Sequence, residues 1–292
     1  MFQVQILLWR QSWGKIFEFT KMEITVIIIT RKRTKLLKKA IASIKSQCFQ
    51  GKIKTLVFID DCSETLNFLE VEYSGDNTIS WSYQERKSGD ISGPSHSAYL
   101  RNLAVESANS EWVSFLDDDN EFESFHYAEL MRCALINQVE AVHCYRQLFY
   151  ADGTPYCFIE GEYPWARNSQ QAKDNFLLLS KNGIIEKGSN IIHDQISTTE
   201  SGVNLVDTNV WLIKREILLK NKIAEYFTHN DWLNIICEDD KMLLGLMNSK
   251  VKICCNNVPS VKYYLGGYSN SDFVNRNAES TSYTEEWREV GD

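Results

Sequence analysis

The sequence predicts an α/β protein with a Rossmann-type, mostly parallel central sheet flanked by helices and a mixed second half. Two observations lead to this prediction. Residues 24–29 and 55–59 are apolar runs rich in β-branched side chains, which is typical of strands buried on both faces of a parallel sheet. The chain between them places apolar side chains at helical spacing, at Leu37, Ala40, Ile41, Ile44 and Cys48. Residues 24–59 therefore predict a right-handed strand–helix–strand unit.

The remaining elements keep this alternation as far as residue 120 and are less regular beyond it. We expect further strands at residues 79–83, 112–116, 141–149, 210–213 and 251–264. We expect helices near residues 98–108, 125–136 and 170–181, and another that begins at 238. Thr34 and Ser63 carry hydroxyls of the kind that cap helices. Residues 151–168 are rich in Gly, Pro, Trp and Tyr, which predicts a long surface loop.

Composition sets the broad class of the protein. The chain has 292 residues, of which 43% are hydrophobic and 24% charged, as in a globular protein of one large domain or two small ones. The formal net charge of −8 argues against broad binding to nucleic acid. The eight cysteines form no C-x-x-C pair and no zinc-ligand spacing, which favours a reducing, cytoplasmic compartment. Basic side chains gather at residues 31–39, either as a solvated helix face or as groups that face phosphate.

Residues 1–21 form a separate, amphipathic N-terminal extension. Its apolar side chains recur at helical spacing, but the segment has no unbroken apolar run long enough to span a membrane and no signal-peptide pattern. Three interpretations stay open. The segment is an extension upstream of a natural start at Met22, a helix that packs on the body of the protein, or an interfacial anchor that makes peripheral contact with a membrane.

Acidic residues follow the buried strand predicted at 112–116, in the sequence Asp117-Asp118-Asp119. Carboxylates at such a strand end are costly unless a cation meets them. Mg²⁺ and Mn²⁺ take oxygen ligands and commonly share their coordination shell with substrate phosphates. Asp117 and Asp119, which alternate past the strand end, are therefore candidate metal ligands. The alternative is an acidic turn before the next helix.

Two more acidic groups have similar alternatives. Asp60-Asp61 follows the strand at 55–59, where a carboxylate accepts from a nucleobase N–H or a ribose hydroxyl, or simply begins a turn. Cys237-Glu-Asp-Asp240 opens a helix, where acids are favoured by the helix dipole without any function. Arg101 is a candidate phosphate ligand because its guanidinium forms two charge-assisted hydrogen bonds, with a surface ion pair as the alternative.

These motifs occur in an order that resembles the inverting family 2 glycosyltransferases of GT-A fold. The relevant segments are V-F-I-D-D-C-S at 57–63, Y-L-R-N-L-A-V-E-S-A at 99–108, W-V-S-F-L-D-D-D-N at 112–120 and E-D-D-K-M-L at 238–243. The resemblance is good over residues 24–120, thin over 121–205 and moderate over 206–249. It implies a nucleotide-sugar-binding half at 22–120 and an acceptor-binding and catalytic-base half at 121–265. A polar tail follows at 266–292.

The resemblance also implies roles for individual residues. Asp61 matches the aspartate that contacts the base, Asp119 the metal ligand, and Asp239 the catalytic base. Asp117 matches a second metal-motif residue close to the ribose. The residues implied to bind the donor are Thr30, Asp61, Arg101, Asp117 and Asp118. The segment 205–215, with Asp207 and Trp211, resembles the acceptor-side segment that precedes the base.

The chain departs from the family pattern at two positions. The first strand usually runs into Pro-Thr-Tyr-Asn, whereas here residues 29–32 are Ile-Thr-Arg-Lys, so the aromatic that packs on the base is missing. Cys62 replaces the glycine that usually follows the aspartate pair. The Gln/Arg-x-x-R-W element of processive synthases is absent as well, which favours transfer of a single sugar.

The resemblance therefore implies an enzyme that moves one sugar from a nucleoside-diphosphate donor, preferably a UDP-sugar, to a carbohydrate or glycoconjugate hydroxyl with inversion. Mn²⁺ or Mg²⁺ would be its cofactor. The aromatic loop with Tyr156, Tyr163, Pro164 and Trp165 is then either an apolar floor for the acceptor or a packed part of the core. Two other functions stay open: a nucleotidyltransferase, and a non-catalytic binding module of the same fold.

Overall fold

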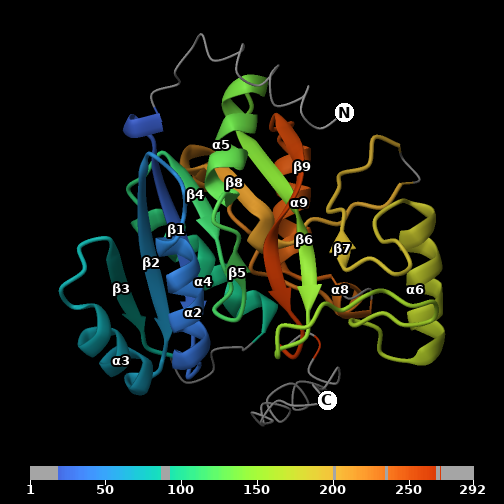
Figure 1. The fold of residues 1–292 in the computed structure, drawn as a ribbon, viewed down its shortest axis with the longest axis horizontal. Coiled ribbons are helices and arrows are strands. Elements are labelled where there is room, and N and C mark those ends of the chain that lie inside the picture. The colour runs from blue at the N-terminus through green and yellow to red at the C-terminus, as the bar shows by residue number, and fades with distance from the viewer. Residues whose placement is uncertain (1–18, 87–92, 200–201, 234–235, 268–269, 271–292) are drawn as a thin grey trace.

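A computed structural model describes residues 19–86, 93–199, 202–233, 236–267 and 270 (Figure 1). The strands are β1 (Glu23–Thr30), β2 (Lys52–Asp60), β3 (Ile79–Gln84), β4 (Trp112–Phe115), β5 (Glu121–Phe122), β6 (Ala141–Phe149), β7 (Ile191–Ile192), β8 (Trp211–Lys214) and β9 (Ile253–Tyr264). The α-helices are α2 (Thr34–Lys45), α3 (Ser63–Tyr73), α4 (Pro94–Ser107), α5 (His126–Asn137), α6 (Ser169–Lys181), α7 (Arg215–Lys220), α8 (His229–Leu233) and α9 (Glu238–Asn248). Two 3₁₀ turns complete the elements, η1 (Phe19–Lys21) and η2 (Thr208–Val210).

The strands form one sheet in the order β3-β2-β1-β4-β8-β6-β9-β5, with β7 paired to β6. β1, β2, β3 and β4 are parallel, as the sequence predicts. The chain runs outward from β1 to β3 and then crosses back through α4, so that β4 pairs with the opposite edge of β1. In such sheets ligands bind beyond the carboxyl ends of the strands where the winding reverses. The topology therefore places the binding region next to the ends of β1 and β4.

The second half of the sheet is mixed, also as expected. β8 is antiparallel to β4 and to β6, whereas β9 is parallel to β6. This half carries α6 and β7 at the side of the molecule away from β1 and β2 (Figure 1). The α/β fold class predicted from the sequence is confirmed.

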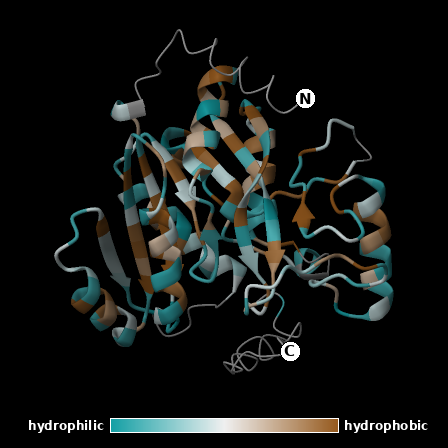
Figure 2. Cartoon of the chain, viewed as in Figure 1, coloured by the Kyte–Doolittle hydropathy of each residue, from teal (hydrophilic) through white to brown (hydrophobic). Residues whose placement is uncertain are grey.

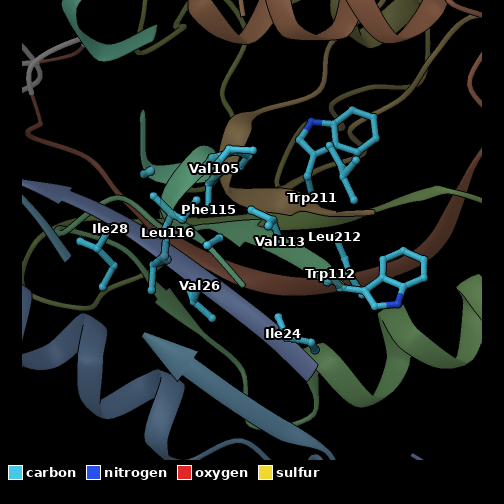
Figure 3. Packing of buried hydrophobic residues seen from close by; sticks show 14 of the residues in the cluster. Ile24, Val26, Ile28, Val105, Trp112, Val113, Phe115, Leu116, Trp211 and Leu212 are labelled. Carbon is cyan, nitrogen blue, oxygen red and sulfur yellow. The ribbon is translucent and has the colours of Figure 1, made fainter. Parts of the chain in front are cut away.

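The core sits between the sheet and its helices. Ile24, Val26 and Ile28 of β1 are completely buried, and Figure 3 shows them in one cluster with side chains of the neighbouring strand β4 and, beyond it, of β8. Hydrophobic residues also dominate β1 and β2 in Figure 2. Burying a side chain of this size contributes about 1.5–3 kcal/mol, and this explains why an unbroken apolar run folds as a central strand rather than as an edge strand.

The loop predicted at 151–168 contains no helix or strand, but its aromatic side chains are not at the surface. Tyr156 and Phe158 are buried and form a second apolar cluster with Phe176 of α6. Trp165 packs at the edge of the same cluster. Of the two interpretations of this loop, the packed one is therefore correct for Tyr156.

Three local predictions need correction. Thr34 and Ser63 are the first residues of α2 and α3, and the residues before them occupy the cap positions. Cys48 was expected on the apolar face of the first helix, but α2 ends at Lys45 and Cys48 is exposed. The short strands β5 and β7 have two residues each, too few for an alternating pattern to reveal.

Both chain ends extend outside the described residues. The N-terminal extension is described only from residue 19, where Phe19–Lys21 forms the turn η1, and the polar tail is described only up to residue 270. Among the residues that the structure describes, no helix has both the length and the apolar composition needed to cross a bilayer. Contact of residues 1–21 with a membrane stays a prediction.

Two buried histidines make the stability of this fold sensitive to acid. His126 is completely buried, stacks on Phe122 with ring centroids 4.0 Å apart, and lies 2.8 Å from the Ser260 hydroxyl through Nδ1. Burial lowers the pKa of His126 to about 3 and that of His143 to about 4. The unfolded chain takes up these protons first, so stability is complete above about pH 6.5 and is lost as the pH falls. Between pH 6.5 and 5 we expect each histidine to cost about 2 kcal/mol.

Urea unfolding between pH 5 and 7 measures this effect. His126→Gln should reduce the loss of unfolding free energy on acidification by about 2 kcal/mol relative to wild type. His229→Gln, which removes an exposed imidazole, is the matched control. An unchanged pH dependence in His126→Gln would contradict the prediction.

Candidate functional site at the carboxyl edge of the sheet

The candidate site begins at the ends of β1 and β4. Thr30 is the last residue of β1, and Asp117 and Asp118 follow β4 after one intervening residue, Leu116. The Thr30 hydroxyl donates a 2.6 Å hydrogen bond to Asp118 Oδ2. Residues that are 88 positions apart in the sequence thus meet at the reversal point of the sheet.

The middle aspartate of the triad faces inward. Asp118 is completely buried and forms a 2.8 Å ion pair with Arg33, in addition to its bond from Thr30. Burial raises the pKa of Asp118 to about 7, although Arg33 and Thr30 favour its charged form. Thr30 and Asp118 are buried and bonded to each other, so they hold the ends of β1 and β4 together. A role for these two residues at the donor stays a prediction.

The outer aspartates each face a different arginine. Asp119 pairs with Arg33 at 2.6 Å. Asp117 pairs with Arg101 at 3.0 Å and accepts a 2.8 Å hydrogen bond from the Asn209 amide. Burial raises the pKa of Asp117 to about 6, even though Arg101 opposes this shift.

Arg101 joins the two halves of the site. Its guanidinium is buried and binds Asp117 through one nitrogen and Glu238 at the start of α9 through the other. Its neighbour Asn102 has a different partner, because its amide donates to the backbone carbonyl of Ile223 at 2.9 Å. Of the Arg-Asn pair singled out in the sequence, the arginine therefore reaches the site and the asparagine anchors α4.

The residues of this edge fit a divalent cation. Five carboxyl groups, from residues 117–119 and 238–239, face two guanidiniums, from Arg33 and Arg101, so acidic side chains outnumber basic ones. Gly267 approaches Asp119 so closely that an added Cβ would lie 2.9 Å from Asp119 Oδ2, so a side chain at position 267 would crowd this carboxylate. Hard oxygen ligands of this kind suit Mg²⁺ or Mn²⁺.

The two predicted metal ligands do not by themselves form a complete coordination sphere. Among the described residues, the group of three side chains close enough to share an ion is Cys237, Glu238 and Asp239. Asp117 and Asp119 are outside it, because their carboxylates turn toward Arg101 and Arg33. Metal at Asp119 would take its other ligands from donor phosphates and water.

A second acidic pair lies at the end of β2. Asp60 is buried and forms hydrogen bonds with Arg86, at 2.6 and 2.8 Å, and with His96 at 3.0 Å. Burial by itself would raise the pKa of Asp60, but Arg86 and His96 outweigh it and hold the pKa well below its usual value. Asp61 has a left-handed backbone, with φ of 45°, and its carboxylate accepts from the Tyr83 hydroxyl at 2.9 Å. Asp60 is therefore structural, and Asp61 is the member that faces outward.

The third acidic group is at the start of α9. Asp240 caps the helix, because its carboxylate accepts the backbone N–H of Cys237 at 2.9 Å. Asp239 instead accepts a hydrogen bond from the Thr208 hydroxyl. Burial raises the pKa of Asp239 well above its usual value, repulsion by Asp207 and Glu238 adds to this, and Arg101 and Thr208 oppose it. A carboxyl with a raised pKa is suited to accept a proton near neutral pH.

Comparison with a family model decides what kind of site this is. The model for glycosyl transferase family 2 matches residues 25–185, which is more than half of the chain. The chain belongs to glycosyl transferase family 2. The predicted resemblance is thereby confirmed at the level of the family. A comparison with curated protein sequences finds no match.

Solved structures support the same fold. TarS from S. aureus, residues 1–349 in complex with UDP-GlcNAc, has a TM-score of 0.52 at 15% identity and is matched over 90% of this chain and 61% of that one. The mannosyltransferase PcManGT from Pyrobaculum calidifontis, in complex with GDP-Man and Mn²⁺, has a TM-score of 0.53 at 13% identity, over 92% and 66% of the two chains. This family 2 chain thus spans about three fifths of the length of the TarS structure. At these identities the likeness shows the GT-A-like fold alone.

Several residues of this family 2 site could not be singled out from the sequence. Thr208 and Asn209 lie inside the segment 205–215 that the resemblance implied, but nothing in the sequence distinguished them from their neighbours. Arg146 has no motif around it and reaches the site only through long-range folding. Arg33 did have a signal, since it lies in the basic cluster at 31–39, one or two members of which were expected to face phosphate. In the structure Arg33 faces Asp118 and Asp119.

Proposed function

We propose that this protein transfers one sugar from a nucleoside-diphosphate donor, with a UDP-sugar favoured, to a hydroxyl of a carbohydrate or glycoconjugate acceptor, with inversion and with the help of a divalent metal. The observation that carries the proposal is the link made by Arg101. It joins Asp117, at the reversal point of the sheet, to Glu238, the neighbour of Asp239. A candidate donor group and a candidate base are thereby held at one edge.

The donor would lie along the ends of β1, β2 and β4. Asp61 is proposed to accept a ring N–H of the base, and Asp117 to contact the ribose. Asp119 would hold Mn²⁺ or Mg²⁺, which neutralises charge on the leaving diphosphate when bound. The solved structures of this fold include complexes with UDP-GlcNAc and with GDP-Man and Mn²⁺, which is consistent with such a donor.

Transfer is proposed to be a single displacement. The acceptor oxygen bonds to the anomeric carbon while the bond from that carbon to the diphosphate oxygen breaks, which inverts the anomeric configuration. The acceptor hydroxyl gives its proton to Asp239, and the nucleoside diphosphate leaves. Arg101, beside Asp117, would add positive charge on the donor side.

Nucleotide binding is the first test of this proposal. We expect one of UDP, GDP, CDP and dTDP to raise the melting temperature in the presence of Mn²⁺ but not in its absence. At about 100 times Kd the stabilisation is about 2.7 kcal/mol, which corresponds to a shift of about 5–10 °C. Asp119→Asn keeps an oxygen for Arg33 but removes a metal ligand, and should abolish the shift.

The control for loss of an acid is Asp174→Ala, on the exposed side of α6, which should keep the full shift. If none of the four nucleotides raised the melting temperature of the wild-type protein, a non-catalytic module would be favoured. Incubation with the matching nucleotide sugar distinguishes the remaining alternative, because a glycosyltransferase releases nucleoside diphosphate whereas a nucleotidyltransferase exchanges pyrophosphate.

A further inference from the structure

Three consecutive side chains before β8 bind three different parts of the site. Asp207 forms a buried ion pair with Arg146. The Thr208 hydroxyl donates to Asp239 Oδ1. Asn209 donates to Asp117 Oδ2 at 2.8 Å and accepts the Asp117 backbone N–H at 2.6 Å. We call residues 207–209 the bridging turn.

The bridging turn is held firmly in place. Asp207 accepts from the backbone N–H of Asn209 at 2.8 Å, and its own backbone N–H donates to Asp194 at 3.0 Å. Its three residues are at most 7% exposed. A segment with this many buried polar contacts has little freedom to move, so it can fix the groups that it touches.

We propose that Thr208 is a positioning residue for the catalytic base, and that the bridging turn sets the placement of this base relative to the donor-side Asp117. This inference rests on the proposed function, in which Asp239 takes the acceptor proton. The Thr208 hydroxyl binds one carboxylate oxygen, Oδ1, and so leaves the other oxygen to take the acceptor proton. The same turn also holds Asp117 on the other side of the site, because Asn209 binds the side chain and the backbone of Asp117.

The Thr208 hydrogen bond also matters for the charge of the base. The groups that face Asp239 are Asp207 from the bridging turn, Arg101 from α4, and Glu238 and Cys237 from its own segment. The two acids and burial disfavour the carboxylate, so its support comes from Arg101 and Thr208. Removing the hydroxyl should raise the pKa of Asp239 further, and the protonated carboxyl cannot accept a proton.

Thr208→Val tests the proposal, because valine has the shape of threonine but no hydroxyl. With a UDP-sugar as donor and water as acceptor, we expect kcat for UDP release at pH 7 to fall about tenfold or more, with KM for the donor within twofold. The acid limb of the pH profile should move upward by about one unit. Thr208→Ser, which keeps the hydroxyl, should restore the wild-type limb. Thr154→Val is the matched control, since it removes a similar Thr-to-Asp hydrogen bond at the exposed Asp152.

A second readout does not depend on activity. In protein labelled with ¹³C at aspartate side chains, the Asp239 carboxyl, assigned by its absence in Asp239→Asn, should titrate at higher pH in Thr208→Val than in Thr208→Ser. The proposal would be overturned if Asp239 titrated at the same pH in Thr208→Val and Thr208→Ser. It would also be overturned if both variants lost kcat equally and the acid limb of the pH profile stayed at its wild-type position. Absence of UDP release from wild type would instead count against the proposed function, while the titration still tests the contact.

Discussion

Asp239→Asn is expected to lower the rate of sugar transfer about 10²–10⁴-fold, because an amide of the same size cannot take the acceptor proton. The melting temperature of this variant should not fall together with its transfer rate. Asp239 lies among Asp207 and Glu238, and its burial as an anion is unfavourable, so its neutral analogue should unfold at the same or a higher temperature. UDP release from a UDP-sugar measures the first effect, and thermal melting measures the second.

The neighbouring Asp240→Asn is the control for this variant. Asp240 caps α9 through its carboxylate oxygen, and an asparagine still offers an oxygen to the Cys237 N–H. We expect transfer within a fewfold of wild type in this control. If Asp239→Asn retained more than a tenth of the wild-type rate while the nucleotide still bound, Asp239 would not be the base.

The first half of the fold, up to residue 120, follows from patterns that are visible in the sequence. A β-branched run such as residues 24–29 has one stable place in a small α/β domain, a strand buried on both faces. Aspartates that directly follow such strands must then meet at one edge, and this places Thr30 next to Asp118. The fold class and the acidic edge were therefore predictable without the structure.

The contacts that organise the site were not predictable in the same way. Asn209 and Asp117 are 92 positions apart, and Arg146 and Asp207 are 61 apart, so neither pair leaves a local pattern. The burial of Asp118 was missed for a related reason. The alternation past the strand separates Asp117 and Asp119 from Asp118, but it does not identify Thr30 and Arg33, the distant partners that the middle aspartate meets.

Arg146→Met is expected to destabilise the protein by about 3–5 kcal/mol. Arg146 is 4% exposed, and its guanidinium lies 3.3 Å from Asp194 and pairs with Asp207. It also lies over the rings of Trp165 and Tyr263, 5.6 and 5.4 Å from their centroids. Methionine fills much of the same volume as arginine. The loss of unfolding free energy therefore comes from the two acids that are left without a partner, and not from a cavity. Urea unfolding at pH 7 measures it.

Further variants separate charge from packing in this cluster. Combining Arg146→Met with Asp194→Asn and Asp207→Asn should recover a large part of the loss, because the neutral amides no longer need a cation. Arg132→Met breaks the partly exposed pair with Glu129 and should cost less than about 1 kcal/mol. If Arg146→Met cost no more unfolding free energy than Arg132→Met, the buried Arg146 and its two acids would not act as one charge cluster. A large loss with recovery would mean that the bridging turn, which begins at Asp207, depends on Arg146 for its place beside Asp239 and Asp117.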